Sequence, residues 1–389
     1  MKKFYSILFL MLITLILTVG STLCLPANLQ EASVDESVDN KSFSKYMTDF
    51  DTGIELYSYK PDEKHEIASM VKIMTALLTL EEIDKGNLTL EEKVTISTNS
   101  SAMGGSQMFL ETGDSYVVSD LLKGIIVVSA NDASVAIAER IAGSHEAFVD
   151  MMNARAKELG MNNTLFCSAT GLPSEREQYS TARDVNIMTR ELMKHDKYYD
   201  YAGIYLENFT HPDGRITQLV NTNKLIRHYQ GCIGGKTGYT AKAGFCLSAC
   251  AERNGLKVVA TVIGCNDSKT RFNQVSRLFD YGFGAYKQQV VYSHDQDMPE
   301  QLTVKASPVK FITVRPERDV AILCKGGEKL GSVSINLPQY VKAPIKKGDV
   351  VGSVTITTQG NEQIINLLAE QDADKAGLFD YIKDLASQW

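Results

Sequence analysis

The chain has 389 residues, of which 44% are hydrophobic and 22% are charged, as in a globular protein. This length exceeds what one ordinary hydrophobic core accommodates, so two domains are expected. The formal net charge of −7 argues against a nucleic-acid partner. It also argues against a general attraction to anionic membranes, although it leaves room for a local anchor.

The N-terminus has the order of a secretory signal peptide. Two lysines precede an apolar run from Phe4 to Val19, and small residues follow this run. The run is shorter than the span of about 20 residues that a membrane helix needs, so cleavage is favoured over a retained helix. We therefore predict a signal peptide over residues 1–27, export of the protein, and a flexible polar leader over residues 28–45.

The seven cysteines show no CxxC spacing, so a metal site is not expected. Cys246 and Cys250 would share one face of a strand, where cysteine behaves as a small buried hydrophobe.

The coarse pattern runs from strand to helices and back to strands. A strand is predicted from Tyr46 to Tyr57, with a break at Asp51-Thr52-Gly53. Helical spacing of apolar residues then predicts five helices, at residues 70–80, 121–128, 133–142, 147–159 and 184–195.

Sheet-like sequence returns at Gly234 and continues to Gly264. Asn254-Gly255 lies between two β-prone runs, which is a strong signal for a hairpin. A closing helix follows near residues 271–281. This order predicts an α+β domain over residues 46–287, whose N- and C-terminal strands share one sheet.

Short alternating runs separated by Gly, Pro and Lys turns predict a small all-β domain over residues 288–372. The last segment, 373–389, is a short amphipathic helix candidate. Leu378, Ile382, Leu385 and Trp389 would form one stripe along it.

Three short patterns carry the candidate chemistry. They are Ser69-Met70-Val71-Lys72, Ser129-Ala130-Asn131 and Lys236-Thr237-Gly238. The spacing of the first pattern also occurs at Ser42 and Ser307, and the spacing of the second recurs elsewhere as well. Context must therefore separate the real matches from chance ones.

Ser69 stands at the start of a predicted helix, so Lys72 lies one turn further on, over the same face. This geometry brings an amine within reach of a hydroxyl, which is a weak nucleophile that needs a base. A helix start also offers free N–H groups to a developing oxyanion. Ser42 in a polar leader and Ser307 before a proline lack this arrangement. Read alone, Ser69 could equally be an ordinary helix cap.

The other two patterns also have two interpretations when read singly. Ser129-Ala130-Asn131 falls in a break between two helices, where it either projects polar groups into a cleft or caps the second helix. Lys236-Thr237-Gly238 lies on a predicted strand after two glycines. There it either receives a substrate backbone along the strand edge or is simply an exposed strand end.

Together, the three patterns resemble the active-site set of penicillin-recognising serine enzymes. The closer similarity is to the serine-type D-alanyl-D-alanine carboxypeptidases, the low-molecular-mass penicillin-binding proteins. Three segments carry it: Ile67 to Ala76, Gly105-Ser106-Gln107-Met108-Phe109-Leu110 and Ala169-Thr170-Gly171-Leu172-Pro173. The resemblance covers most of residues 45–287. It implies an exopeptidase that removes the terminal D-alanine from peptidoglycan stem peptides ending in D-Ala-D-Ala, and that β-lactam antibiotics inhibit.

The resemblance also implies roles for individual residues. Ser69 attacks the carbonyl, Lys72 accepts its proton and Ser129 relays a proton to the leaving amine. Asn131 holds the peptide backbone, and Lys236 and Thr237 bind the terminal carboxylate.

The N–H groups of Ser69 and Tyr239, which follows Gly238, form the oxyanion hole in this scheme. Arg271 either assists carboxylate binding or makes an ordinary surface salt bridge. No metal or organic cofactor is needed. Where the family often has His after Lys-Thr-Gly, this chain has Tyr239, which leaves a backbone role intact but not a side-chain role.

Two alternative classes of enzyme use the same chemistry, and a third alternative is a protein without activity. A class A β-lactamase would usually have Ser-Asp-Asn at residues 129–131 and a Glu-x-x-Leu-Asn string, which residues 132–235 lack. A transpeptidase would pass the acyl group to an amine. A wall-binding or antibiotic-sensing module without activity would be expected to have lost residues from the three patterns.

For the C-terminal segment, the resemblance implies a membrane anchor that would hold the protein at the outer face of the cytoplasmic membrane or in the cell wall space. The alternative is a helix packed on the β domain. Asp380 and Asp384 outweigh Lys383 on the polar side, so an anchor here would be weak and reversible.

Overall fold

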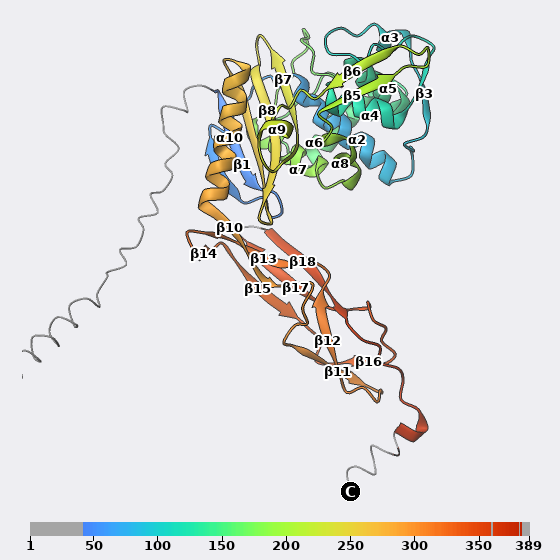
Figure 1. Cartoon of the computed structure of the whole chain (residues 1–389), viewed down its shortest axis with the longest axis vertical. Helices are drawn as coiled ribbons and strands as arrows, with labels where there is room; N and C mark the ends of the chain where they lie inside the picture. Colours follow the sequence, from blue (N-terminus) through green and yellow to red (C-terminus); the bar gives the residue numbers. More distant parts are fainter. Residues whose placement is uncertain (1–41, 359–360, 381, 383–389) are drawn as a thin grey trace, which may run out of the picture. The chain divides into compact units, whose positions relative to one another are not determined.

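The computed structural model describes residues 42–358, 361–380 and 382 (Figure 1). The predicted signal peptide and most of the predicted leader therefore lie outside the described residues. The first part of the described chain is built on a five-stranded antiparallel sheet with the order β2-β1-β9-β8-β7. Its strands are β1 (Ser44–Asp49), β2 (Glu55–Tyr59), β7 (Cys232–Thr240), β8 (Gly244–Arg253) and β9 (Leu256–Cys265). The prediction that early and late strands share one sheet is confirmed.

The two faces of this sheet bury different side chains because strand residues alternate between faces. Val258 and Val262 of β9 belong to a hydrophobic cluster with helix α10 (Ser268–Ala285). Val259 and Ile263 belong to a larger cluster with the remaining helices. The sheet thus separates α10 on one face from the helical part of the domain on the other (Figure 1).

The helical part contains most of the side chains of the larger core. Helix α2 crosses it, and nine consecutive residues from Lys72 to Leu80 are buried. Its helices are α2 (Lys72–Asp84), α3 (Thr98–Ser101), α4 (Val118–Val127), α5 (Asn131–Ala142), α6 (His145–Glu158), α7 (Ala182–Leu192), α8 (Asp196–Ala202) and α9 (Leu225–His228). Two hairpins accompany them: β3 (Lys93–Thr95) with β4 (Ser115–Val117), and β5 (Leu206–Thr210) with β6 (Ile216–Val220).

The five predicted helices correspond to α2 and α4 to α7, with ends that differ by a few residues. The predicted hairpin at Asn254-Gly255 is confirmed, because both residues have positive φ, at 51° and 77°, between β8 and β9. Such a pair suits the tight turn that joins two twisted strands. The first strand begins at Ser44, two residues before its predicted start.

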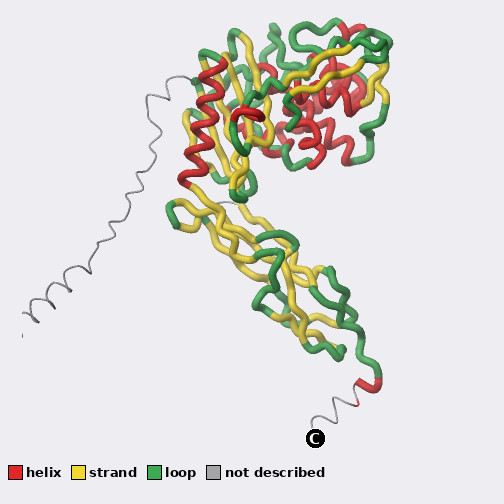
Figure 2. The backbone as a smooth tube through the Cα atoms, in the orientation of Figure 1, coloured by secondary structure: helices red, strands yellow, loops and turns green. Residues whose placement is uncertain are grey.

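Strands and loops also dominate the C-terminal part from residue 286 on, as Figure 2 shows in yellow and green. Six strands form one sheet in the order β15-β17-β18-β12-β11-β16, and three form another in the order β10-β13-β14. Residues from both sheets, such as Val320 and Val354, share one buried cluster. The strands are β10 (Tyr286–Tyr292), β11 (Gln301–Lys305), β12 (Phe311–Pro316), β13 (Val320–Lys325), β14 (Glu328–Lys329), β15 (Gly331–Asn336), β16 (Val341–Lys342), β17 (Val350–Thr358) and β18 (Asn361–Ala369). A β-rich domain therefore follows the α+β domain, as predicted.

The predicted C-terminal helix falls largely outside the described residues. Leu378, Phe379 and Asp380 have helical backbone, and the side chains of Leu378 and Phe379 are 75% and 80% exposed. Among the helices of the described ranges, none combines the length and the apolar character needed to cross a membrane.

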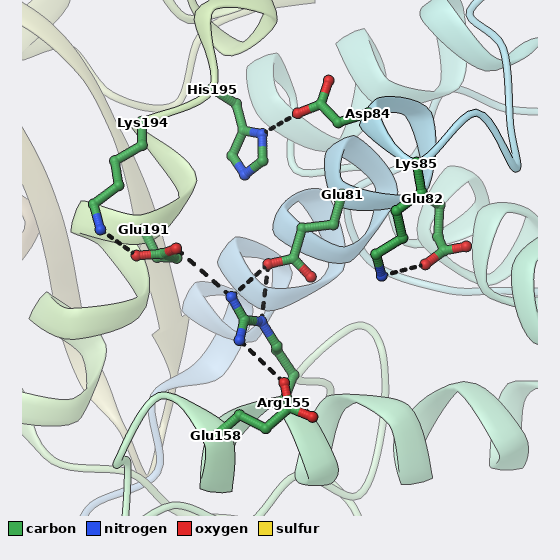
Figure 3. Close-up of polar contacts among 9 residues, drawn as sticks. All are labelled: Glu81, Glu82, Asp84, Lys85, Arg155, Glu158, Glu191, Lys194 and His195. Carbon is green, nitrogen blue, oxygen red and sulfur yellow. Dashed lines mark hydrogen bonds and ion pairs between the residues drawn. The ribbon is translucent and has the colours of Figure 1, made fainter. Parts of the chain in front are cut away.

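A network of charges joins three helices of the α+β part (Figure 3). The Arg155 guanidinium on α6 donates from Nε to Glu81 Oε1 of α2 at 2.8 Å and from Nη1 to Glu158 at 3.1 Å. Its Nη2 also lies 3.6 Å from Glu191 of α7. Because the side chains of Arg155 and Glu81 are only 24% and 12% exposed, solvent screens their interaction less than that of a fully exposed ion pair.

Replacing Arg155 with alanine is expected to lower the free energy of unfolding by about 1 kcal/mol, the upper end for partly exposed ion pairs. Urea denaturation at low and high salt measures this loss. The matched control is Lys85→Ala, which removes a more exposed ion pair to Glu82 on α2, and should change stability little. Equal effects of the two substitutions would show that Arg155 does not tie the helices together.

Candidate active site

The first site element is a tight 3-10 turn, η2 (Ala68–Val71), that leads directly into α2. It carries Ser69, which is partly exposed, while Lys72 is completely buried. Lys72 Nζ lies 3.1 Å from Ser69 Oγ and donates to the carbonyl oxygen of Thr170 at 2.6 Å. The predicted pairing of hydroxyl and amine is therefore present in the structure.

The turn is held in an unusual backbone conformation. Ala68 has a positive φ of 48°, which costs a residue with a Cβ atom roughly 1 kcal/mol or more. Gly171 lies against it, and a Cβ atom on Gly171 would come within 2.1 Å of the Ala68 carbonyl oxygen. Only glycine fits at this position, so the segment that supplies the Thr170 carbonyl packs closely on the turn that carries Ser69.

The second pair of functional groups joins the helical part to the sheet. Ser129 lies in the break between α4 and α5 with a positive φ of 65°. Its Oγ accepts a hydrogen bond of 2.7 Å from Lys236 Nζ, and the same amine donates to the Thr237 carbonyl oxygen at 3.1 Å. Lys236 lies on β7, one of the two edge strands of the sheet, so two sequence motifs more than 100 residues apart meet here.

Gly238 brings this edge strand against the turn that carries Ser69. A Cβ atom on Gly238 would lie 2.6 Å from the Ile67 carbonyl oxygen and 3.2 Å from the Ala68 Cβ. Contacts this short are not tolerated, so any side chain would push β7 away from η2. The glycine of the third motif therefore sets the width of the site.

Asn131, the first residue of α5, faces the segment before it. Its Nδ2 donates to the Gly104 carbonyl oxygen at 2.6 Å, and its backbone N–H donates to the Ser106 carbonyl oxygen at 2.7 Å. Its Oδ1 is buried and has no hydrogen-bond partner among the residues that the structure describes. Because Nδ2 is committed to Gly104, Oδ1 is the atom left to accept a hydrogen bond from a ligand.

The alternative of an ordinary surface salt bridge at Arg271 is wrong, because this side chain is buried in α10 at 7% exposure. Its guanidinium donates to the carbonyl oxygens of Gly238 and Cys246 at 3.2 and 3.3 Å. It thus contacts the back of the third motif. Tyr239, in contrast, is 56% exposed, and its ring stacks on Phe245 at 4.2 Å.

Burial of the two lysines dominates the electrostatics of the site. Burial lowers the pKa of Lys72 well below its ordinary value of 10.5, the nearby Lys236 lowers this pKa further, and Asp132 opposes the change. Burial, and then Arg271, lower the pKa of Lys236 to about 7. Apolar side chains such as Ile73 and Ile125 line a small cavity beside both lysines. An amine in this environment loses its proton at a pH at which a lysine in water would keep it.

Three contributors were missed in the sequence. Thr170 acts through its backbone carbonyl oxygen, which no side-chain pattern reveals. His145 Nε2 accepts the N–H of Ala169 at 3.0 Å and so fixes the same segment. Asp132 directly follows the second motif, and its acidic side chain at a helix start was the available signal.

These groups define a class of protein. A serine hydroxyl lies beside a buried lysine whose pKa is lowered, and the lysine of a second serine–lysine pair lines the same small cavity. This is the equipment for acyl transfer through a covalent serine intermediate.

Comparison with known proteins gives the family. Residues 30–267 match the family of D-alanyl-D-alanine carboxypeptidases, and residues 286–375 match the family of the penicillin-binding protein 5 C-terminal domain. The chain is similar to D-alanyl-D-alanine carboxypeptidase DacF of Bacillus subtilis, at 38% identity over 92% of this chain and 93% of that protein. It is also similar to DacC of Escherichia coli, at 31% identity over 91% and 90% of the two chains.

Among solved structures, penicillin-binding protein 5 of Haemophilus influenzae has 27% sequence identity and a TM-score of 0.64, covering 86% of this chain and 98% of that one. The chain belongs to the D-alanyl-D-alanine carboxypeptidase family and is a serine-type peptidase of that kind.

The close approach at Gly238 gives a prediction. Gly238→Ala is expected to reduce the rate of acylation by a fluorescent penicillin at least roughly tenfold, because a displacement of about 1 Å in an active site has effects of this size or larger. Stopped-flow labelling measures the rate. The control is Gly203→Ala after α8, where an added Cβ would meet nothing within 4 Å. An unchanged rate in Gly238→Ala would mean that the approach of β7 to η2 does not set the geometry.

Proposed function

We propose that Ser69 is the nucleophile and Lys72 its general base. The observation that carries this assignment is the 3.1 Å separation of Ser69 Oγ from Nζ of a buried lysine whose pKa is strongly lowered. The neutral amine accepts the hydroxyl proton as Oγ forms a bond to the carbonyl carbon of the penultimate D-alanine. The Thr170 carbonyl oxygen aligns the amine for this transfer.

In this scheme, the leaving group departs on the side of the site that carries Ser129 and Lys236. When the C–N bond breaks, Ser129 passes a proton to the amine of the terminal D-alanine. It regains a proton through the side-chain amines of Lys236 and Lys72. Lys236 and Thr237 bind the carboxylate of that residue, which makes the enzyme an exopeptidase. Binding of the anion favours the charged form of Lys236, so substrate itself would raise the pKa of this lysine from about 7.

The remaining groups position the acyl carbon. The backbone N–H groups of Ser69 and Tyr239 would stabilise the oxyanion, a role that the contact of β7 with η2 at Gly238 supports. Asn131 Oδ1 would accept an N–H of the stem peptide. Arg271 would hold the Gly238 and Cys246 carbonyl oxygens behind the site by hydrogen bonds rather than contact the substrate directly. Water then attacks the ester and releases Ser69.

The substrate is proposed to be a peptidoglycan stem peptide ending in D-Ala-D-Ala, with β-lactams acylating the same serine. Export to the outer face of the cytoplasmic membrane or the cell wall space would bring enzyme and substrate together. Within this scheme, residues 46–287 form the peptidase domain and residues 288–372 a spacer.

The nucleophile assignment predicts that Ser69→Ala abolishes both D-alanine release from a D-Ala-D-Ala pentapeptide and covalent labelling by a fluorescent penicillin. The matched control is Ser307→Ala, which removes the serine of another SxxK match, a hydroxyl that accepts the Val309 N–H in the β domain. This control should keep both activities. Labelling of the Ser69→Ala protein would disprove the assignment.

We further propose that the C-terminal segment is a weak, reversible membrane anchor. Its support is the exposure of the apolar side chains of Leu378, Phe379 and Ile382, at 75%, 80% and 53%, on one short helical segment that follows the β domain. Apolar side chains on one stripe of a helix partition into the interface of a bilayer. Asp380 and Asp384 limit the electrostatic contribution.

A deletion tests the anchor. It should begin at Leu378, because the Ala376 N–H donates to the Ala306 carbonyl oxygen and belongs to the β domain. Deletion of residues 378–389 is expected to reduce co-sedimentation with phosphatidylglycerol–phosphatidylethanolamine vesicles while hydrolysis of a soluble peptide persists. The full-length double variant Leu378→Glu, Phe379→Glu should show the same loss of vesicle binding and the same retained hydrolysis as the deletion protein. Unchanged vesicle binding, or unfolding of the deletion protein, would refute the anchor.

A further inference from the structure

Asp132 is a buried carboxylate in the first turn of α5 whose contacts go beyond an ordinary helix start. Its side chain accepts the backbone N–H of Met108 at both oxygens, at 3.1 and 3.0 Å, and the N–H of Leu110 at 3.1 Å. Its Oδ1 also accepts the N–H of Ala133 at 2.9 Å. The residue is only 1% exposed. One carboxylate thus satisfies three backbone donors from two segments, and these bonds are of the stronger, charge-assisted kind.

The donors at Met108 and Leu110 belong to the segment of residues 104–110 that lies against Asn131, here named the 104–110 wall. Asn131 binds the earlier half of the same segment, at Gly104 and Ser106, as described above. Gly105 packs so closely that a Cβ atom there would lie 2.9 Å from Asn131 Nδ2. Asp132 and Asn131 therefore hold residues 104–110 together, and the segment in turn holds the Asn131 amide with Oδ1 unpaired.

Asp132 also acts electrostatically on the buried amine of Lys72. The positive group that acts on Lys72 is Lys236 on β7, and Arg271 on α10 acts in turn on Lys236. The one carboxylate with a marked influence on Lys72 among the described residues is Asp132, which raises the pKa that burial and Lys236 lower. Without this negative charge, no carboxylate among the described residues would offset the effect of Lys236 on the base.

We propose that Asp132 is a positioning residue of the carboxypeptidase reaction, which fixes the 104–110 wall and the Asn131 amide and balances the positive charge around Lys72. This inference rests on the proposed roles of Ser69 and Lys72. Asp132 itself touches no reacting atom. Its effect reaches the substrate through Asn131 and the base through the local field.

Two substitutions separate the two effects. Asp132→Asn keeps the size of the side chain but removes the charge and turns an amide N–H₂ toward backbone donors. Asp132→Glu keeps the charge but displaces it by one methylene. The matched control is Asp184→Asn, another buried carboxylate in the first turn of a helix, which accepts from Asn163 N–H at 2.9 Å and Thr164 Oγ1 at 2.8 Å in a loop outside the site.

The readout is the second-order rate of penicillin acylation as a function of pH. Asp132→Asn should lower the maximal rate at least roughly tenfold, as expected when a site wall shifts by about 1 Å. It should also move the acid limb of the profile down by about one pH unit, because loss of a nearby negative charge lowers the pKa of Lys72 and the base stays neutral at lower pH. Asp132→Glu should lower the rate with little movement of the limb. Asp184→Asn should leave the limb in place.

Hydrogen exchange at the Met108 and Leu110 amides gives a second readout that needs no activity. Exchange there should be faster in both Asp132 variants and unchanged in Asp184→Asn. If Asp132→Asn does not fold, Asp132→Glu still tests the positioning of the wall by exchange and rate. Unchanged exchange and rate, or a rate loss in Asp132→Asn without movement of the acid limb, would overturn the proposal. Failure of the carboxypeptidase assignment would appear differently, as wild-type enzyme that releases no D-alanine while exchange still responds to Asp132.

Discussion

The burial of two lysine side chains beside one small cavity is the constraint on which the site depends. Lys72 and Lys236 come from a helix and from a sheet edge, and each is paired with a serine, Ser69 or Ser129. Removing an amine from water disfavours its charged form, and a second amine nearby strengthens the effect. The fold therefore gives Lys72 the lowered pKa that its proposed role as a base requires, and Asp132 partly opposes this change in pKa.

Bringing these groups together requires backbone conformations that the rest of the domain must hold. Ala68 and Ser129 both have positive φ, and each precedes or carries a functional hydroxyl. Such residues persist where surrounding packing determines them, and they cluster at functional sites. Here the packing comes from the glycines that let β7 and the Thr170 segment approach, and from the large core around α2. The packing of the core therefore maintains the strained backbone at Ala68 and Ser129.

The features that could be predicted from the sequence are those that hydrophobic periodicity and turn residues determine. The helices with apolar stripes, the Asn254-Gly255 hairpin and the sheet shared by early and late strands all follow from local patterns. The three motifs were found because each combined a reactive residue type with a helix start, a break or a strand. Other features lacked such a signal. The Thr170 carbonyl belongs to the backbone, the burial of Arg271 depends on how α10 packs on the sheet, and β18 reads as an apolar run that fits helix or strand equally well.

The most direct test of this account is the titration of Lys72 itself. The Cε resonance of Lys72 can be followed by NMR in ¹³C-lysine-labelled enzyme and identified by its loss in the Lys72→Arg variant. The account predicts a titration midpoint far below the ordinary value of 10.5, so that the amine is largely neutral where the enzyme works. A midpoint near 10.5 would show that Lys72 stays charged, and would contradict its role as the base that activates Ser69.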